Sequence, residues 1–339
     1  METGATWNRR AWLTGGAWKH ASRSPRSTAD IVIARRAMAC EFSVSLPGTE
    51  RNAFEVGCAA LDEIERLERR LTVYDDASDV SALNRAAAER AVPLDVELAG
   101  LLRTAGRLYA ETDGAFDAAS GALVRAWGFL RGPKGVPSPE QHAAARAVSG
   151  WRHVRLDAAG GARDQARLAF DRPGVELNLG AIGKGFAIDS ALDLLRARHG
   201  VATALVQGGR SSLRAIGEPT GGWQVAIGDP RRPESSVACV RLHDEALGTS
   251  GADNQFFEAD GRRFGHVLDP RSGWPAEGLL SASVVAPSAA EADALSTAFF
   301  VMGLEAARRF CAEHPKIGAV LVLPEEIVVL GTADVEVTS

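Results

Sequence analysis

The sequence has few of the residues from which metal clusters and disulfide frameworks are built. Of its 339 residues only 4 are cysteines, and they lie far apart without a CxxC pair, at Cys40, Cys58, Cys239 and Cys311. This spacing argues against a zinc knuckle and against a disulfide scaffold. The 7 histidines form neither an HExxH motif nor any other close pair, so that zinc-binding signature is absent as well.

Long apolar runs and a strong charge excess are also absent. No segment reaches the roughly 20 consecutive apolar residues that a membrane-spanning helix needs, so we expect no transmembrane segment. Lys and Arg number 38 against 43 Asp and Glu, and the formal net charge of -5 gives no global reason to expect nucleic acid as a partner. The 46% hydrophobic content is enough for one large core or two smaller ones.

The first residues look like the start of an export signal that is not completed. Arg9-Arg10 is typical of a twin-arginine leader, which an uncharged apolar stretch and a small-residue cleavage site should follow. Lys19 and Arg23 interrupt that stretch instead. We interpret residues 1–29 as a flexible or degenerate leader, expect a soluble chain, and favour the cytoplasm as its compartment.

Beyond the leader, residues 30–339 have the composition of one domain. Amphipathic spacing and capping residues predict helices at 52–71, 96–109, from 138 onward, 184–198, around Asp293 and, more weakly, at 305–311. Short β-rich runs predict strands at 31–33, 42–46, 154–156, 168–170, 175–178, 204–206, 224–227, 236–242, 281–285 and 320–323. Because helices and strands do not alternate strictly, the predicted fold class is α+β rather than a doubly wound sheet.

The helix around Asp293 carries the most informative polar pair. Asp293 and Thr297 are four residues apart, so they share one helical face and can direct two oxygens to one point. Such oxygens suit magnesium, which prefers one or two carboxylates together with substrate phosphates. Ser288 and Glu291 form a capping-box pattern at the helix start. Alternatively, Asp293 is a solvated or capped carboxylate and Thr297 bonds back to the preceding turn, the more common case for such a pair alone.

A glycine-rich passage from Asn178 to Gly185 leads from a predicted strand into a helix. Glycine allows close approach of the backbone to a ligand, and the free N–H groups at the following helix start can bind an anion. The passage matches neither the GxGxxG fingerprint nor the P-loop, because the glycine spacing differs and no Ser or Thr follows Lys184.

Acidic and aromatic residues occur together in two neighbouring segments, Gly114–Asp117 and Trp127–Phe129. An aromatic-lined pocket with polar groups fits a planar ligand. Phe116 and Trp127 could equally belong to the ordinary core.

Two further segments are predicted to be turns that carry chemical groups. Gly248–Gly251 bears hydroxyls, and Gly265–Pro270 bears an imidazole and a carboxylate. An isolated histidine such as His266 is more often a structural residue than a catalyst. Each of these clusters is a weak signal alone.

Taken in order, the clusters resemble the ApbE family, the FAD:protein FMN transferases. The resemblance covers most of the chain, from about Met38 to Gly303. The matching segments are Met38, Leu71–Tyr74 with Ser78–Asn84, Gly114–Asp117 with Trp127–Phe129, Leu179–Asp189, Thr249–Gly251, His266–Pro270 and Ala292–Thr297. So many matches in the right order are far more specific than any single match.

This resemblance implies a single α+β domain in which mixed or antiparallel sheets and flanking helices enclose a flavin site. Members of the family cleave FAD between its phosphates, transfer the FMN half to a Thr or Ser hydroxyl of an acceptor protein, and release AMP. They require Mg²⁺. Many relatives act outside the cytoplasmic membrane, so the family analogy also allows a periplasmic location.

The resemblance also implies roles for individual residues. Asp293 and Thr297 match side-chain metal ligands, and Ala181 matches a position that supplies a backbone carbonyl. His266 is favoured over Asp269 as the group that accepts the proton of the acceptor hydroxyl, and Lys184 adds positive potential at the pyrophosphate. The positions that match the FAD-binding residues are Met38, Tyr74, Ala115, Phe116, Asp117, Asn178, Lys184 and Val267.

Some positions depart from the family pattern. Asn178 stands where an aspartate is usual, so hydrogen-bonding capacity is kept and a charge is lost. Arg210 stands where Asp or Asn is usual. This arginine either pairs with phosphate or marks a site that has diverged from the family. Two alternatives therefore remain, an FAD-binding or FAD-hydrolysing homologue without a protein acceptor, and a non-enzymatic interaction domain. Thr3–Thr6 resembles the motif that these enzymes modify, which suggests automodification at Thr6.

Overall fold

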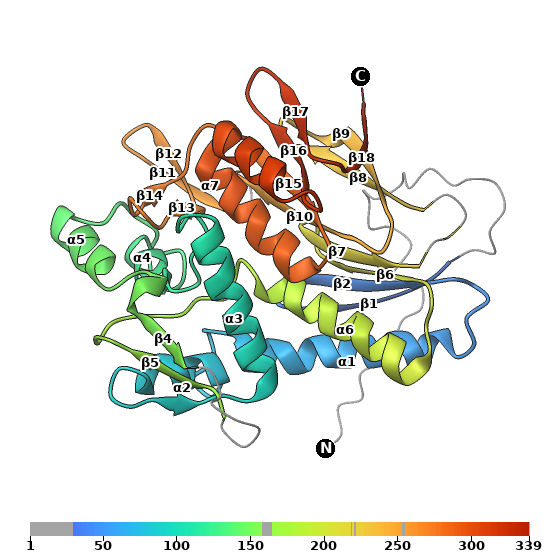
Figure 1. Ribbon diagram of the computed structural model, residues 1–339. Helices are drawn as coiled ribbons and strands as arrows, with labels where there is room; N and C mark the ends of the chain where they lie inside the picture. The colour runs from blue at the N-terminus through green and yellow to red at the C-terminus, as the bar shows by residue number, and fades with distance from the viewer. Residues whose placement is uncertain (1–29, 158–164, 218, 220–221, 253–254, 339) are drawn as a thin grey trace, which may run out of the picture.

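The computed structural model describes residues 30–157, 165–217, 219, 222–252 and 255–338 (Figure 1). The predicted leader and the acceptor-like Thr6 lie outside these residues. Among the described residues, no helix is both long and apolar enough to cross a membrane.

Helices begin where a polar side chain caps a run of apolar residues with helical spacing. Ser78 and Asp95 each accept a hydrogen bond from a backbone N–H of the first turn, and Ser138 with Gln141 forms the predicted capping box. In the described part of the chain the α-helices are α1 (Ala53–Leu71), α2 (Asp79–Ala86), α3 (Val96–Glu111), α4 (Gly121–Ala126), α5 (Pro139–Ala147), α6 (Gly183–His199) and α7 (Ala289–Glu313).

The centre of the fold is an eight-stranded sheet in which every neighbouring pair is antiparallel. Its strands, in spatial order, are β1 (Ile31–Ala37), β2 (Cys40–Leu46), β6 (Ala204–Gly208), β7 (Ser212–Ile216), β10 (Ala246–Gly251), β15 (Ser281–Ala286), β16 (Gly318–Val322) and β17 (Ile327–Leu330).

Smaller sheets surround the large one. A three-stranded sheet has the order β18 (Asp334–Val337), β9 (Arg232–Leu242), β8 (Trp223–Asp229). A second has the order β3 (Val92–Pro93), β5 (Arg167–Phe170), β4 (Val154–Asp157). The two-stranded sheets are β11 (Phe256–Ala259) with β12 (Arg262–Gly265), and β13 (Leu268–Asp269) with β14 (Trp274–Pro275).

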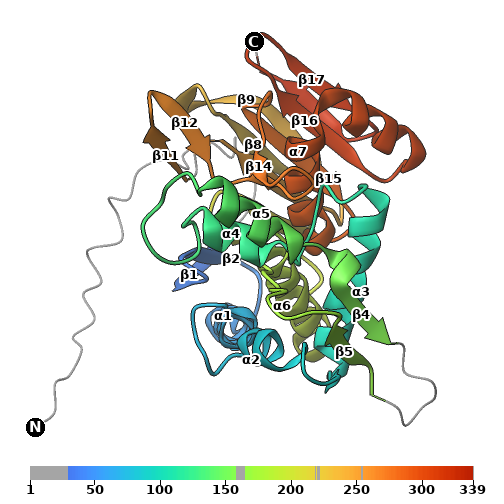
Figure 2. The ribbon, with the colours of Figure 1, turned by 90° about the vertical axis from the view of Figure 1, so that its left-hand side faces the viewer.

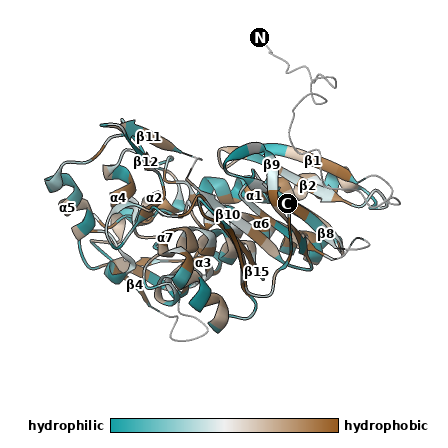
Figure 3. Cartoon of the chain, turned by 90° about the horizontal axis from the view of Figure 1, so that it is seen from above, coloured by the Kyte–Doolittle hydropathy of each residue, from teal (hydrophilic) through white to brown (hydrophobic). Residues whose placement is uncertain are grey.

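The two faces of the large sheet bury different side chains, as the alternation of a strand requires. In β16, Ala319 and Leu321 belong to the core shared with the helices, whereas Val320 and Val322 belong to the core shared with β8 and β9. Seen from above, β10 and β15 lie between α7 on one side and β8 on the other (Figure 3). The layers are therefore helices, large sheet and small sheet.

Helices α1, α6 and α7 pack together on one face of the large sheet, with α3 against α7 (Figure 1). At one end of these layers lie α4, α5 and the hairpin of β11 and β12 (Figure 2). That end has its own apolar cluster around the fully buried Trp127. The combination of helices with antiparallel sheets confirms the predicted α+β class.

The predicted strand at residues 175–178 is wrong. This segment is extended, but it makes only an isolated bridge, between Glu176 and Ser120. Its backbone is paired by a side chain instead, because the Asn84 amide accepts from Leu177 N at 2.8 Å and donates to Leu177 O at 3.0 Å. A side-chain amide here replaces the neighbouring strand that the apolar run predicted.

The predicted turn at Gly248–Gly251 is also wrong, since these residues form most of the central strand β10. The reason is packing: a Cβ atom at Gly248 would lie 2.2 Å from the carbonyl oxygen of Ala292 in α7. The small residues therefore allow this segment to pack closely against α7. This packing outweighs the low intrinsic β-propensity of glycine, so the segment forms a strand.

Helix α7 contains both predicted helices, around Asp293 and at 305–311, with a break at Gly303 (φ 76°, ψ 179°). The predicted capping box is only half present. Ser288 Oγ accepts from Glu291 N at 3.2 Å, but the Glu291 carboxylate forms an ion pair with Arg107 of α3.

Candidate active site

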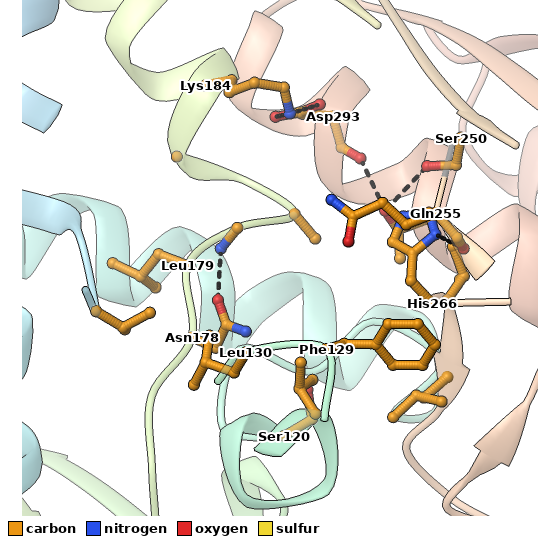
Figure 4. A pocket seen from close by; sticks show the side chains of 18 of the residues that line it. Ser120, Phe129, Leu130, Asn178, Leu179, Lys184, Ser250, Gln255, His266 and Asp293 are labelled. Carbon is orange, nitrogen blue, oxygen red and sulfur yellow. Dashed lines mark hydrogen bonds and ion pairs between the residues drawn. The ribbon is translucent and has the colours of Figure 1, made fainter. Parts of the chain in front are cut away.

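Residues that are far apart in the sequence line one cavity of about 480 Å³. Small-molecule ligands occupy pockets of roughly 300–1,000 Å³. The cavity wall contains all residues to which the family resemblance assigned a catalytic, metal-binding or FAD-binding role, namely Met38, Tyr74, Ala115, Phe116, Asp117, Asn178, Ala181, Lys184, His266, Val267, Asp293 and Thr297. Figure 4 shows Lys184 and Asp293 on one side, with Phe129 and Ser120 across from them.

Asp293 is the buried carboxylate of the cavity, only 4% exposed. Ser212 Oγ donates to its Oδ1 at 2.7 Å, and the backbone N–H of Gly185 donates to its Oδ2 at 3.1 Å. Lys184 Nζ lies 3.3 Å from Oδ2 and 3.4 Å from Oδ1. The charge is therefore compensated by one ammonium and two neutral donors, as a buried carboxylate requires.

Two glycines let this carboxylate meet its partners. A Cβ atom at Gly185 would lie 2.0 Å from the carbonyl oxygen of Ala289, and one at Gly248 would lie 2.7 Å from the backbone nitrogen of Asp293. Real side chains do not approach backbone atoms so closely. The first turn of α7 is consequently held against both α6 and β10, with Asp293 at their junction.

Thr297 lines the cavity one turn after Asp293, as their shared helical face predicted. Its Oγ1 lies 3.1 Å from Ser250 Oγ of β10. In the described part of the chain, no group of three or more His, Cys, Asp or Glu side chains could hold a metal. One carboxylate, one hydroxyl and the backbone of Ala181 in the same wall suit Mg²⁺ only if phosphate or water oxygens complete the set.

His266 is far from Lys184 in the sequence but lies in the same cavity wall. Its Nδ1 is 3.1 Å from the carbonyl oxygen of Gln255. Because a carbonyl can only accept, Nδ1 carries the proton and Nε2 keeps a lone pair in the neutral ring. Burial, assisted by the nearby charges of Lys134 and Lys184, lowers the pKa of His266 below its ordinary value, although the hydrogen bond to Gln255 opposes the shift. The ring is therefore a neutral proton acceptor near pH 7.

Asn178 shows why the usual aspartate is not required for the local fold. Its Oδ1 accepts from Gly180 N at 3.0 Å (Figure 4). Its backbone N–H donates to Ala118 O at 2.8 Å. An amide oxygen makes this turn as well as a carboxylate does. The passage into α6 therefore keeps its shape while it loses one negative charge.

Aromatic residues were predicted to line a pocket for a planar ligand, and the structure divides them. Phe129 lines the cavity and is partly exposed, whereas Phe116 lies in the wall but is only 2% exposed and belongs to the apolar core. Trp127 does not: it is fully buried, and its Nε1 donates to Gly273 O at 2.9 Å. The alternative of ordinary core is thus correct for Trp127.

Asp117 is a largely buried carboxylate at the edge of the cavity. Its Oδ1 accepts from Ala119 N at 2.8 Å and from Trp151 N at 3.1 Å. Burial raises the pKa of Asp117 to about 6, although these hydrogen bonds and Arg152 oppose the shift. The side chain therefore fixes the loop that carries Ala115 and Phe116.

Met38 and Tyr74 lie in the cavity wall, on segments that connect regular elements. Met38 and Ala39 form the two-residue turn between β1 and β2, and both have positive φ, 47° and 62°. Non-glycine residues adopt this conformation at a cost. The Met38 N–H donates to Glu68 Oε1 at 2.7 Å, which supports the turn. Tyr74 is 63% exposed.

Several lining residues were not predicted. Gln255, Glu68 and Ser211 belong to the wall, and Ser212 reaches Asp293 from 81 positions earlier in the chain. Isolated polar residues of this kind have no sequence pattern that distinguishes them from surface residues.

Arg210 lies outside the cavity wall. It is exposed, and its guanidinium lies next to Gly228 of β8, with Nη2 3.2 Å from the position of a Cβ there. The suggested pairing of Arg210 with a bound phosphate is therefore not supported.

Comparison with known proteins identifies the family. A sequence model of the ApbE family matches residues 38–321, which is most of the chain. The chain belongs to the ApbE family. This ApbE-family chain is 32% identical to an FAD:protein FMN transferase of Salmonella typhimurium, over 88% of this chain and 86% of that protein. It is 35% identical to an FAD:protein FMN transferase of Treponema pallidum, over 82% of this chain and 80% of that protein.

A solved structure shows the same architecture. The crystal structure of an ApbE protein from Thermotoga maritima superposes with a TM-score of 0.80 and 29% sequence identity, covering 89% of this chain and 97% of that chain. The arrangement of helices and antiparallel sheets is therefore the fold of the ApbE family.

Proposed function

We propose that this chain transfers the FMN half of FAD to a Thr or Ser hydroxyl of an acceptor protein and releases AMP, in a reaction that requires Mg²⁺. The observation that carries the proposal is the meeting of Lys184, Asp293, Thr297 and His266 in one cavity with aromatic surface. The names of the similar proteins support the choice of FAD as substrate and of a protein as acceptor.

The cavity has the groups that phosphoryl transfer needs. Such reactions depend mainly on positioning and on neutralising charge at the phosphates. The Lys184 ammonium and the positive end of the α6 dipole provide positive potential in the wall. Asp293, Thr297 and the Ala181 carbonyl would hold Mg²⁺, which when bound would neutralise charge on the pyrophosphate oxygens.

The acceptor hydroxyl must lose its proton as it attacks. In the proposed reaction its oxygen forms a bond to the phosphorus of the FMN half, and the bond from that phosphorus to the bridging oxygen breaks. The electron pair of that bond leaves with AMP. The hydroxyl proton passes to Nε2 of His266, which is the unprotonated nitrogen because Nδ1 donates to Gln255 O.

Tyr74, one of the predicted FAD-binding positions, and Phe129 would hold the flavin half. Phe129 offers partly exposed apolar surface, and Tyr74 lies exposed in the cavity wall. Flat aromatic ligands are bound by such surface with a few polar groups for orientation. We therefore propose that the flavin ring lies toward these side chains, and the pyrophosphate toward Lys184 and Asp293.

The test is an incubation of the purified chain with FAD, Mg²⁺ and a threonine-containing acceptor protein. We expect AMP release together with an added mass of FMN less one water on the acceptor, and loss of both with chelator or in Asp293→Asn. Equal AMP release with and without acceptor would make the chain an FAD hydrolase instead. A ligand that binds the folded state raises the unfolding temperature. If FAD and Mg²⁺ leave the unfolding temperature unchanged, the result would favour a non-enzymatic interaction domain.

The same experiment examines Thr6 of the chain itself. Intact mass after incubation with FAD and Mg²⁺ alone shows whether the chain modifies itself, and Thr6→Ala identifies the site. No added FMN in the absence of acceptor excludes automodification.

A further inference from the structure

Asp189 is a largely buried carboxylate of α6, 13% exposed, that lies outside the cavity wall. Its Oδ1 accepts from Ala289 N and its Oδ2 accepts from Ala290 N, both at 2.9 Å. These are the first two N–H groups of α7, which have no partner within their own helix. A side chain of one helix thus caps the first turn of another.

The same carboxylate also holds a strand of the large sheet. Arg214 Nη1 of β7 donates to Asp189 Oδ1 at 2.8 Å, and the two side chains are only 15% and 13% exposed. Buried pairs of this kind contribute little net stability, because desolvation offsets the attraction. They do fix geometry, since either partner left alone would be an uncompensated buried charge.

The three elements that Asp189 joins are the three that surround the Asp293 carboxylate. Helix α6 supplies Lys184 and the Gly185 N–H, β7 supplies Ser212, and α7 carries Asp293 itself. Asp293 lies one turn after Ala289, so its direction depends on how the first turn of α7 is seated. Arg214 lies two residues after Ser212, on the same strand.

We propose that Asp189 is a positioning residue, which sets the direction of the Asp293 carboxylate toward a bound divalent cation by fixing α6, β7 and the first turn of α7 together. The inference rests on the proposed function in that Asp293 is taken to be a ligand of the cation. Asp189 itself touches neither substrate nor cation, because it lies behind the wall that Lys184 and Asp293 form.

This role differs from helix capping alone. Ser288 Oγ caps the same turn by accepting from Glu291 N at 3.2 Å, but it belongs to the residue that precedes α7 and makes no link to α6. Removal of either cap weakens the start of the helix. Only removal of Asp189 also releases the helix from α6 and β7.

The experiment compares three variants of the full chain by titration with Mn²⁺, followed by electron paramagnetic resonance, in the absence of FAD. Asp189→Asn removes the charge and one acceptor, and we expect Mn²⁺ binding about tenfold weaker than in the wild type, with the protein still folded at the assay temperature. Ser288→Ala should lower the unfolding temperature, because it removes a cap of the same turn, but should leave the Mn²⁺ affinity within twofold. Asp193→Asn, on the exposed side of α6, should behave as the wild type.

The outcomes separate the two proposals. Wild-type protein that does not bind Mn²⁺ overturns the cation requirement, and with it the role of Asp189. Wild-type protein that binds Mn²⁺, with unchanged affinity in Asp189→Asn or an equal loss in Ser288→Ala, overturns the positioning role and leaves the proposed function intact. If Asp189→Asn does not fold, Arg214→Lys provides the test: it keeps a charge but not the fork of the guanidinium, and an affinity within twofold of the wild type would equally exclude the positioning role.

A second readout comes from turnover with FAD. A positioning defect should raise the Mg²⁺ concentration needed for half-maximal rate about tenfold, while the KM for FAD changes less than threefold. Equal changes in both would indicate a general loss of structure, and would contradict the proposal.

Discussion

Lys184 Nζ lies 3.3 Å from Asp293 Oδ2 and 3.4 Å from Oδ1, so an ammonium lies close to both oxygens of the carboxylate in the cavity wall. The two side chains are 22% and 5% exposed, and the pair is therefore weakly screened. A divalent cation that binds Asp293 must share the carboxylate with this positive charge. The phosphates of a dinucleotide would offer Lys184 another partner.

Lys184→Met should accordingly have opposite effects on cation binding and on turnover. Without FAD, we expect Mn²⁺ to bind several-fold more tightly, because no ammonium competes for Asp293. With FAD, we expect kcat/KM to fall by about 10²–10³, because a positive group at the phosphates is lost. Mn²⁺ titration and steady-state AMP release measure the two effects. Lys134→Met, which removes the ammonium over the ring of Phe129, is the matched control. Weaker Mn²⁺ binding in Lys184→Met would contradict the competition.

The pH dependence of turnover should report the ionisation of His266. The base acts in its neutral form, and burial with the charges of Lys134 and Lys184 lowers its pKa below 6.5. The rate should therefore be constant near pH 7 and should fall only as the pH drops below the ordinary histidine value. His266→Gln should remove this acid limb and reduce kcat/KM by about 10²–10⁴.

Asp269 is the control for that experiment. Its carboxylate accepts from Arg271 at 2.8 and 2.9 Å through two guanidinium nitrogens, which leaves it poorly placed to take a proton. We expect Asp269→Asn to keep the acid limb and most of the rate. An acid limb that disappears in Asp269→Asn and persists in His266→Gln would reverse the assignment.

The residues of the cavity were predictable where they belong to motifs, and unpredictable where they act alone. Asp293 and Thr297 share a helical face, and Asn178 to Gly185 form a recognisable strand-to-helix passage. Ser212 has no such pattern, because its partner lies 81 positions away and only the packing of β7 against α7 brings them together. Long-range pairing of single polar residues depends on the tertiary fold.

The same limit applies to the fold. Periodicity predicted α1, because one face of this helix packs on the core beside the large sheet. It failed at Gly248–Gly251, where small residues look like a turn but form a central strand, and at residues 175–178, where the amide of Asn84 replaces a neighbouring strand. In both places a contact distant in sequence overrides local propensity.

Asp117 should make stability depend on pH in an unusual direction. Its pKa is raised from 3.8 to about 6 in the folded protein, so the folded state binds the proton more tightly than the unfolded chain does. That contribution is complete below pH 3.8 and is lost as the pH rises through about 6, a loss of about 3 kcal/mol. Asp117→Asn cannot titrate, and its amide oxygen can keep the hydrogen bonds from Ala119 N and Trp151 N.

The measurement is the free energy of unfolding by urea for both proteins between pH 4 and 7. The wild type should lose about 3 kcal/mol relative to Asp117→Asn over this range. The comparison removes the contributions of all other groups, since these are common to both proteins. A difference that does not change with pH would show that the carboxyl ionises normally.

Gly185→Ala should separate α6 from α7. The added Cβ would lie 2.0 Å from Ala289 O and 2.6 Å from Ala290 N, which are backbone atoms and cannot move aside alone. Such overpacking costs about 1–3 kcal/mol of unfolding free energy, and it should also weaken the hydrogen bond from the Gly185 N–H to Asp293, 3.1 Å in length. We therefore expect lower stability together with weaker Mn²⁺ binding.

Gly100→Ala is the same chemical change on another helix, with no atom within 4 Å of the added methyl group. There the substitution only restricts the unfolded chain and improves helix propensity, so it should stabilise the protein by about 0.5–1 kcal/mol. Urea denaturation of both variants at one temperature compares the two sites directly. If Gly185→Ala also gained stability, α6 and α7 would not be in the close contact on which the position of Asp293 depends.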